Sequence, residues 1–228
     1  MGCQALRNVP EQKLKSAMAE IESLQDIQKR TLLKKLYHRY YEANIPFNYW
    51  KLEMNKHFSG DKNLLKIYND AVEDVTKTYN DGTSLCLAGS FGVGKSFTVT
   101  NILKRAVEKG YSGQYVNLTD IISATKSPDS YEARKTLIKV DFLVIDEFDP
   151  RYIANENSSD FFGRVLEDIM RNRFQNKQPV FMCTNALDPI NAFSGTLKQS
   201  ITSLMNYVSL VPVLGSDFRK KENKDNNV

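Results

Sequence analysis

The chain has 228 residues, of which 41% are hydrophobic and 25% are charged, a balance typical of a soluble globular protein. No apolar run approaches the roughly 20 residues that span a bilayer, so the sequence argues against a membrane-spanning helix. The net charge is +4, and residues 1–60 carry all of the surplus, with ten Lys or Arg against six Asp or Glu. This basic region is either a solvated helical surface or a surface that meets nucleic acid or an acidic partner.

The N-terminal part of the chain is predicted to be helical. Residues 11–42 contain no proline or glycine, and their apolar residues recur at helical spacing, which predicts one long or two shorter amphipathic helices. Pro46 ends this region, because proline disfavours helix for the residue before it. A further amphipathic helix is expected over residues 61–79, and the dipeptide Asp81-Gly82 then turns the chain into its first strand.

From residue 84 onward, short apolar strands alternate with helices. Strands are expected at 84–88, 113–118, 140–146, 179–184 and 208–214, and helices at 95–108, 118–135, 159–174 and before the last strand. This alternation predicts an α/β fold with a central parallel sheet and helices on both faces. The expected organisation is a helical N-terminal region over 1–45, the α/β domain over 46–218 and a charged, solvated tail over 219–228.

The cysteines and histidines do not suggest a metal site. Cys3, Cys86 and Cys183 have no paired spacing, and the last two lie in apolar strands, so we expect buried, reduced thiols and a cytosolic compartment. His38 and His57 have no cluster of cysteine or carboxylate ligands around them in the sequence.

Residues 89–96, GSFGVGKS, match the phosphate-binding pattern G-x-x-x-x-G-K-[ST] and lie between a predicted strand and a predicted helix. The glycines allow successive backbone N–H groups to point at phosphates, and the helix N-terminus adds its dipole. Lys95 is expected to reach the β- and γ-phosphates, and the Ser96 hydroxyl to bind Mg²⁺. The predicted nucleotide-binding residues are Gly89, Ser90, Phe91, Gly92, Val93, Gly94, Lys95 and Ser96.

Two further strand ends carry polar residues suited to ATP hydrolysis. In FLVIDE, Asp146 is placed to hold Mg²⁺ and Glu147 to act as the base for the attacking water. In FMCTNA, Asn185 stands at the tip of a strand expected between the other two, where it would orient the water; a turn-forming asparagine is the alternative. The paired Asp and Glu favour an ATP-hydrolysing protein over a nucleotide kinase or a small GTPase.

Together, GSFGVGKS, FLVIDE, the strand ending in TN, the late VLGSDFR and the lead-in YYEANIPFNYW resemble the AAA+ ATPases of the DnaC/IstB type, the bacterial and phage helicase loaders. The resemblance covers roughly residues 40–220. It implies an ATP- and Mg²⁺-dependent P-loop AAA+ module that binds single-stranded DNA and delivers a replicative helicase to it. It further implies helicase contact through residues 1–45, nucleotide-dependent homo-oligomers in the cytoplasm of a bacterial cell or phage-infected host, and a nucleotide-sensing role for Arg219.

One departure from the resembled pattern concerns the arginine that a neighbouring subunit contributes to hydrolysis. Between Asn185 and Arg219 the sequence has no arginine, so Lys198, Arg171, Arg173 or a partner must serve, and we expect slow hydrolysis by the isolated protein. Two rival functions stay open. One is an IstB-like transposition helper acting on double-stranded DNA, and the other is an ATP-gated adaptor that does not hydrolyse.

The DNA contacts are less sharply marked. The resemblance places residues 118–135 near DNA, where Lys126, Arg134 and Lys135 would neutralise phosphates; an ordinary solvated helix is the alternative. The run KKLYHRYY, residues 34–41, would stack bases or else bury its aromatic residues along a helix stripe.

Overall fold

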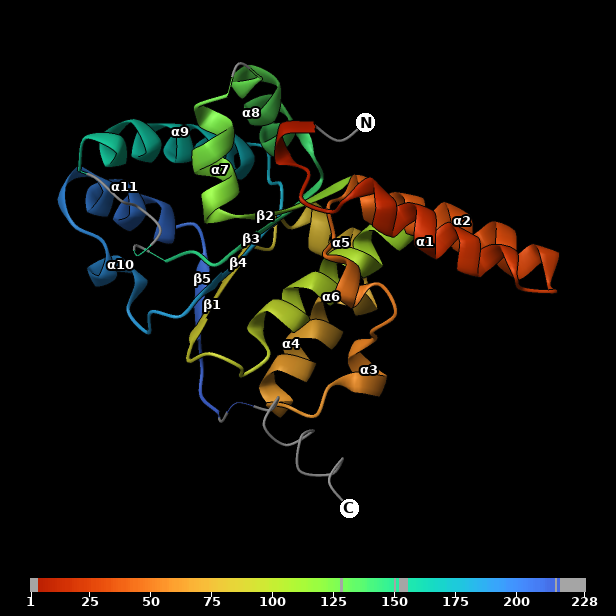
Figure 1. Cartoon of the computed structure of the whole chain (residues 1–228). Coiled ribbons are helices and arrows are strands. Elements are labelled where there is room, and N and C mark those ends of the chain that lie inside the picture. Colours follow the sequence, from red (N-terminus) through yellow and green to blue (C-terminus); the bar gives the residue numbers. More distant parts are fainter. Residues whose placement is uncertain (1–3, 128, 150, 152–155, 216, 218–228) are drawn as a thin grey trace.

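The computed structural model describes residues 4–127, 129–149, 151, 156–215 and 217. Over these residues the strands form one parallel sheet in the order β2-β3-β4-β1-β5 (Figure 1). The strands are β1 (Leu85–Gly89), β2 (Gly113–Asn117), β3 (Phe142–Asp146), β4 (Val180–Thr184) and β5 (Ser209–Val213). The order places β4 between β1 and β3, so the carboxyl ends of the three motif-bearing strands lie side by side at one end of the sheet. The predicted α/β class is confirmed.

Helices cover both faces of the sheet. Figure 1 shows α4 (Lys62–Glu73) and α6 (Lys95–Glu108) on one side, and α7 (Leu118–Thr125), α9 (Glu156–Gln175) and α11 (Gly195–Met205) on the other. The remaining helices are α1 (Glu11–Glu22), α2 (Ile27–Glu42), α3 (Met54–His57), α5 (Val75–Asn80), α8 (Ser130–Lys139) and α10 (Pro189–Ala192).

Strand β3 explains why the sheet needs helices on both faces. All five of its residues are buried, and the first four alternate between two apolar clusters. Phe142 and Val144 pack on the face covered by α4 and α6, whereas Leu143 and Ile145 pack on the opposite face. Because successive strand side chains point to opposite faces, a continuous apolar run of this kind requires burial on both sides.

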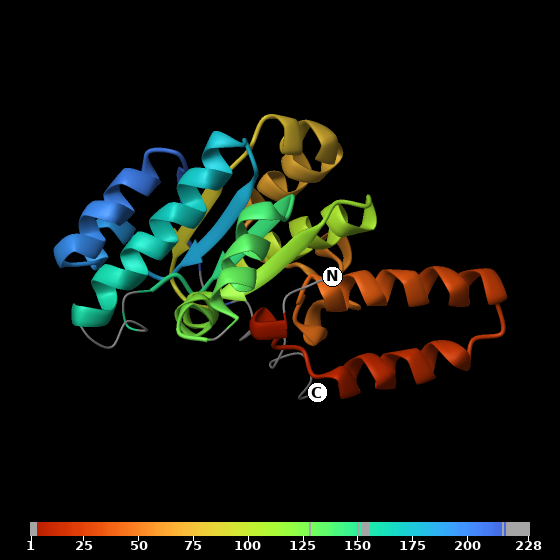
Figure 2. The same cartoon turned by 90° about the horizontal axis from the view of Figure 1, so that it is seen from above.

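The N-terminal helices α1 and α2 form an antiparallel pair, here called the hairpin, that extends away from the sheet (Figure 2). Asp26 separates them by capping α2, since its side chain accepts from the Lys29 backbone N–H at 3.0 Å. At the far end of the hairpin, Glu22 of α1 pairs with Arg30 and Lys34 of α2. The predicted helical N-terminal region is therefore present, in its two-helix form.

The single helix expected over 61–79 is instead two helices. Asp74 leaves the helical conformation, with φ −133° and ψ 87°, and its carboxylate accepts from the Lys77 backbone N–H as the cap of α5. Apolar spacing does not reveal such a break, because the same buried face continues through both helices.

The two edges of the sheet differ. Along β2, the Tyr115 backbone N–H donates to the Ala43 carbonyl at 2.8 Å, and the Asn44 side chain donates to the Tyr115 carbonyl at 2.9 Å. The segment that follows α2 therefore occupies this edge. At the opposite edge, β5 contains Pro212, which has no N–H to donate.

Both strand cysteines, Cys86 and Cys183, are buried free thiols, as expected. Burial raises the pKa of Cys86 to about 12. Within the described ranges, the chain forms no helix with the length and apolar character needed to cross a membrane. The tail predicted over 219–228 lies outside the described residues.

Candidate nucleotide site

The turn after β1, residues 89–96, is here called the phosphate loop. Gly92 and Gly94 have φ values of +76° and +102°, in the left-handed region that glycine adopts without steric cost. Gly89 has a separate packing role, because a Cβ there would lie 2.2 Å from the Val213 carbonyl oxygen. Two glycines therefore set the path of the loop, and the third allows β5 to approach it.

The Lys95 side chain points into the phosphate loop and is only 5% exposed. Its ammonium donates to the carbonyls of Gly89 and Ser90, both at 2.8 Å, and to Oδ1 of Asn185 at 3.1 Å. The structure thus holds a buried positive charge where the sequence predicts the phosphates of a nucleotide.

Asp146 ends β3 beside the start of α6. Its Oδ1 accepts from the Ser96 hydroxyl at 3.0 Å and from the Glu147 backbone N–H at 2.8 Å. Its Oδ2 accepts from the hydroxyl of Tyr115 at 2.6 Å. The two residues predicted to hold Mg²⁺ are therefore in direct contact, although 50 positions separate them in the chain.

Glu147 follows Asp146 in a turn with φ +52°, a conformation that is uncommon outside glycine and is often found at functional sites. The turn allows the Phe148 backbone N–H to donate to the Cys183 carbonyl at 2.8 Å. The Glu147 side chain is exposed at the carboxyl end of β3. Its pKa is raised by burial of part of the carboxyl group and, secondly, by the neighbouring Asp146.

At the end of β4, Thr184 and Asn185 divide two tasks. The Thr184 hydroxyl accepts from the Ala186 backbone N–H at 3.1 Å and so stabilises the turn. The Asn185 amide is directed at Lys95 instead. The alternative of a purely turn-forming Asn185 therefore lacks support, because Thr184 supplies the turn contact.

The donor set fits a magnesium–nucleotide complex. Hydroxyl and carboxylate oxygens are the ligands Mg²⁺ prefers, and it usually takes one or two protein groups together with phosphate oxygens. Among the described residues, no group of three or more His, Cys, Asp or Glu side chains forms a self-sufficient metal site. Ser96 and Asp146 would thus hold Mg²⁺ jointly with the phosphates that Lys95 and the N-terminus of α6 bind.

Sequence reasoning missed Tyr115, Asp149 and Arg151, which lie beside this cluster. Tyr115 of β2 contacts Asp146, as described above. Arg151 makes a bidentate pair with Asp149, at 2.8 and 2.7 Å, and its guanidinium lies 5.2 Å from the centre of the Phe91 ring in the phosphate loop. The sequence signal for Arg151 is its position four residues after Glu147, whereas Tyr115 depends on strand register that the sequence does not display.

Of the cations considered for a catalytic role in a neighbouring subunit, Arg173 is excluded. It is fully buried and donates to backbone carbonyls at the end of α8 and at the starts of β3 and β4, including those of Leu137 at 2.7 Å and Pro179 at 2.9 Å. Arg171 is exposed and pairs with Glu167, and Lys198 donates to Asn191. Arg219 lies outside the described residues.

The predicted DNA-contacting residues lie on or beside α7 and α8. Lys126 is exposed after α7, Arg134 pairs with Asp168 at 2.7 Å, and Lys135 pairs with Glu132 at 3.3 Å. Exposed pairs of this kind are weak, so all three cations stay available to phosphates.

The run at residues 34–41 does not offer bases an exposed aromatic stack. Tyr37, Tyr40 and Tyr41 are at most 8% exposed, and Tyr37 and Tyr40 pack on Trp50. The structure therefore shows the alternative, a buried helix stripe, because these residues face the core rather than solvent.

Comparison with known proteins agrees with this fold. No protein-family model matches the chain. The replicative helicase loader DnaI of Bacillus subtilis (strain 168) is 27% identical over 121 residues, a match spanning 50% of this chain and 38% of DnaI. The chain thus matches well under half the length of this curated relative.

Solved structures define the fold class. A crystal structure of DnaI has a TM-score of 0.61 at 19% identity, covering 75% of this chain and 93% of that one. The DnaC helicase loader gives 0.56 at 19% identity, over 73% and 99% of the chains. AMPPCP-bound DnaA from Aquifex aeolicus gives 0.60 at 19% identity, over 78% and 56%.

The sheet and phosphate loop thus define a P-loop protein with the AAA+ fold. The motifs carried a resemblance to AAA+ ATPases of the DnaC/IstB type, the helicase loaders. That resemblance is confirmed by the similarity of the chain to the helicase loaders DnaI and DnaC.

Proposed function

We propose that this chain is an ATP-hydrolysing helicase loader that places a replicative helicase on single-stranded DNA during replication, in the cytoplasm of a bacterial cell or phage-infected host. The observation that carries the proposal is the contact of Lys95 with Asn185 and of Ser96 with Asp146, across three neighbouring strands. The similarity to the helicase loaders DnaI and DnaC supports the choice of a helicase as the partner. The ATPase module spans residues 46–218 in this proposal.

Each polar residue has a distinct role in the proposed hydrolysis. Lys95 exchanges its carbonyl partners for phosphate oxygens, and Ser96 and Asp146 hold Mg²⁺, which would neutralise phosphate charge. Glu147 accepts the proton of the attacking water, and Asn185 orients that water beside Lys95. The raised pKa of Glu147 suits a base, since a more basic carboxylate accepts a proton more readily.

Hydrolysis by the isolated chain should be slow. Arginines that stabilise the transition state increase the rate about 10³–10⁵-fold in other phosphoryl-transfer proteins. Arg173 is committed to backbone carbonyls, which leaves Arg171, Lys198 or a partner for this task. A turnover comparable to strongly active AAA+ proteins, measured without any partner, would contradict this view.

The partner contacts follow from the same proposal. The helicase meets residues 1–45, which include the hairpin, and single-stranded DNA meets Lys126, Arg134 and Lys135. Nucleotide between subunits promotes a homo-oligomer. Substituting Lys126 and Lys135 with Glu should weaken single-strand binding. It should also make binding less dependent on salt, because a protein with fewer phosphate contacts releases fewer counterions from the DNA.

The burial of Arg173 also favours a second candidate, an adaptor in which ATP promotes assembly without being hydrolysed. Glu147→Gln separates the two functions. In a hydrolysing loader it stabilises the ATP-bound complex with helicase, whereas in an adaptor the complex persists equally with Glu or Gln at position 147.

The deciding experiment is co-purification of the chain with the replicative helicase of its own host, with and without ATP. Lys95→Ala should abolish the ATP-dependent part of the complex, and Lys66→Ala, an exposed lysine on α4, should leave it intact. Absence of a complex under every nucleotide condition would reject the loader. Binding to double-stranded DNA would then be the next measurement, as the transposition-helper function requires.

A further inference from the structure

The base of the hairpin is fixed by one buried amide. Asn44 is 2% exposed and has φ +54°, a left-handed conformation that asparagine tolerates. Its Oδ1 accepts from the backbone N–H groups of Asn8 at 2.7 Å and Val9 at 3.2 Å. Its Nδ2 donates to the carbonyls of Leu6 at 2.8 Å and Tyr115 at 2.9 Å. The entry to α1 and the exit from α2 are thereby joined to β2.

Tyr115 is the residue of β2 to which this base is joined, and it also reaches the nucleotide site. Its backbone N–H donates to Ala43 and its backbone carbonyl accepts from the Asn44 side chain. Its side-chain hydroxyl donates to Oδ2 of Asp146 at 2.6 Å. The ring is 6% exposed. Burial keeps the pKa of Tyr115 well above its usual value, so the hydroxyl stays protonated as a donor.

The bond to Tyr115 leaves the opposite oxygen of Asp146 for the metal side of the site. Oδ1 faces the Ser96 hydroxyl and the Glu147 backbone N–H, whereas Oδ2 is held by the tyrosine. A carboxylate held in this way can turn only if the tyrosine moves with it. In metal sites, partners of this kind behind a ligand change metal affinity about 10–100-fold.

We infer that Tyr115 is a positioning residue that orients Asp146 toward Mg²⁺ and couples occupancy of the magnesium–nucleotide site to the base of the hairpin. The inference rests on the proposed function in that it takes Ser96 and Asp146 as the Mg²⁺ ligands. It adds a route by which the partner-binding region responds to the nucleotide.

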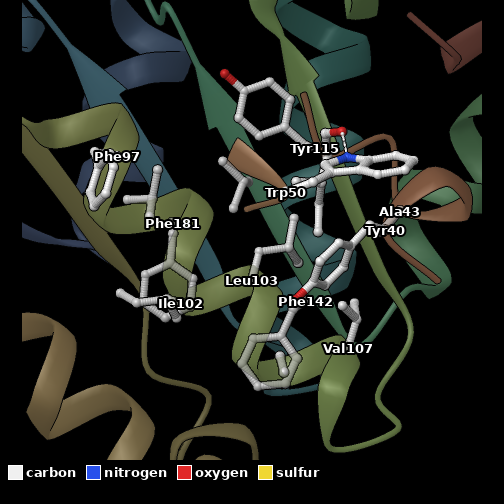
Figure 3. Packing of buried hydrophobic residues seen from close by; sticks show 14 of the residues in the cluster. Tyr40, Ala43, Trp50, Phe97, Ile102, Leu103, Val107, Tyr115, Phe142 and Phe181 are labelled. Atoms are coloured by element: carbon white, nitrogen blue, oxygen red, sulfur yellow. Dashed lines mark hydrogen bonds between the residues drawn. The ribbon is translucent and has the colours of Figure 1, made fainter. Parts of the chain in front are cut away.

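The chain contains its own reporter of this coupling. Trp50 is the single tryptophan, is 4% exposed, and donates through Nε1 to the carbonyl of Ile45 at 2.8 Å, one residue after Asn44. Figure 3 shows Trp50, Tyr40 and Tyr115 within one packed cluster. A displacement of the hairpin base therefore changes the surroundings of the indole ring.

The test is a Mg²⁺ titration of the ATP-bound full chain that follows Trp50 emission and retention of a fluorescent ATP analogue. In the wild type, Mg²⁺ should shift Trp50 emission. Tyr115→Phe keeps the ring and removes only the hydroxyl; it should bind the analogue as well as wild type without Mg²⁺. It should also require about tenfold more Mg²⁺ for half-saturation and lose the Trp50 response.

Tyr111→Phe is the matched control, because it removes a tyrosine hydroxyl that donates to Thr76 at 3.0 Å, remote from Asp146. It should behave as wild type. A Tyr115→Phe protein with wild-type Mg²⁺ dependence and a wild-type Trp50 response would overturn the inference. Failure of the wild type to bind the analogue would instead reject the proposed nucleotide site.

Hydrogen exchange of the wild type gives a second test that needs no variant. The Tyr115 backbone N–H, bonded to Ala43, should exchange more slowly with ATP and Mg²⁺ than with ATP alone. Equal exchange in the two states would overturn the inference, whatever the stability of Tyr115→Phe.

Discussion

The Lys95 ammonium donates to Oδ1 of Asn185 at 3.1 Å, although 90 positions separate the two residues in the chain. Asn185→Ala should leave ATP affinity within about threefold of wild type, since the phosphate loop is intact, but lower the hydrolysis rate about 10²-fold through loss of a group that orients water. Nucleotide binding and phosphate release measure the two effects. Asn176→Ala, at the end of α9, is the control, and a loss of binding equal to that of Lys95→Ala would contradict the assigned role.

Glu147→Gln should reduce hydrolysis about 10²–10⁴-fold while ATP still binds, because the amide cannot accept the proton of the attacking water. The pH dependence follows from the raised pKa of Glu147. The carboxylate must be ionised to act as a base, so the rate should fall on acidification at a higher pH than an ordinary glutamate would give. A Gln variant with the wild-type rate at every pH would remove Glu147 from the mechanism.

Arg173 should be essential to stability rather than to hydrolysis. Arg173→Met removes the guanidinium hydrogen bonds to the carbonyls of Leu137, Val140 and Pro179, and each hydrogen bond to a charged group contributes about 1.5–3 kcal/mol. We expect the free energy of unfolding to fall by at least about 3 kcal/mol in urea denaturation. The neighbouring exposed Arg171→Ala should change it by less than about 1 kcal/mol, and equal effects of the two substitutions would contradict the structural role of Arg173.

Lys104 gives a prediction for the dependence of stability on pH. It is 3% exposed and donates to the carbonyls of Tyr49 and Leu52, and its burial lowers the pKa from 10.5 to about 8. Between these values the unfolded chain binds more protons than the folded chain, so this group makes stability rise with pH. In urea denaturation, the wild type should gain stability relative to Lys104→Met between pH 7 and pH 9.5. A difference that stays constant or shrinks would show that Lys104 titrates normally.

The sequence was sufficient to predict the alternation of strands and helices. It also placed Lys95, Ser96, Asp146, Glu147 and Asn185 together at the carboxyl ends of the strands. Those residues follow from local patterns, a glycine turn or a polar residue after a buried strand, and the topology of a parallel sheet brings such ends together. The break at Asp74 was missed, because a capping aspartate within an unbroken apolar stripe has no distinct periodicity.

The role of Tyr115 could not be predicted, because it depends on which residue of β2 lies beside β3. Tyr115 pairs with Val144, and this register places its side chain on the same face as Asp146, two residues further along β3. The structural role of Arg173 could not be predicted either, because it also depends on tertiary contacts. Sequence reveals its charge and its position near a helix end, but not that the ends of α8, β3 and β4 converge around it.

The occupied edge of β2 and the proline in β5 restrict how this molecule can associate. An exposed strand edge invites a foreign strand to extend the sheet, which leads to strand exchange or fibrous aggregates. Here Ala43 and Asn44 already take up backbone groups of Tyr115 on one side, and Pro212 withholds a donor on the other. Neither edge is a good template for sheet extension, so subunits and partners of this chain should recognise one another through side-chain surfaces.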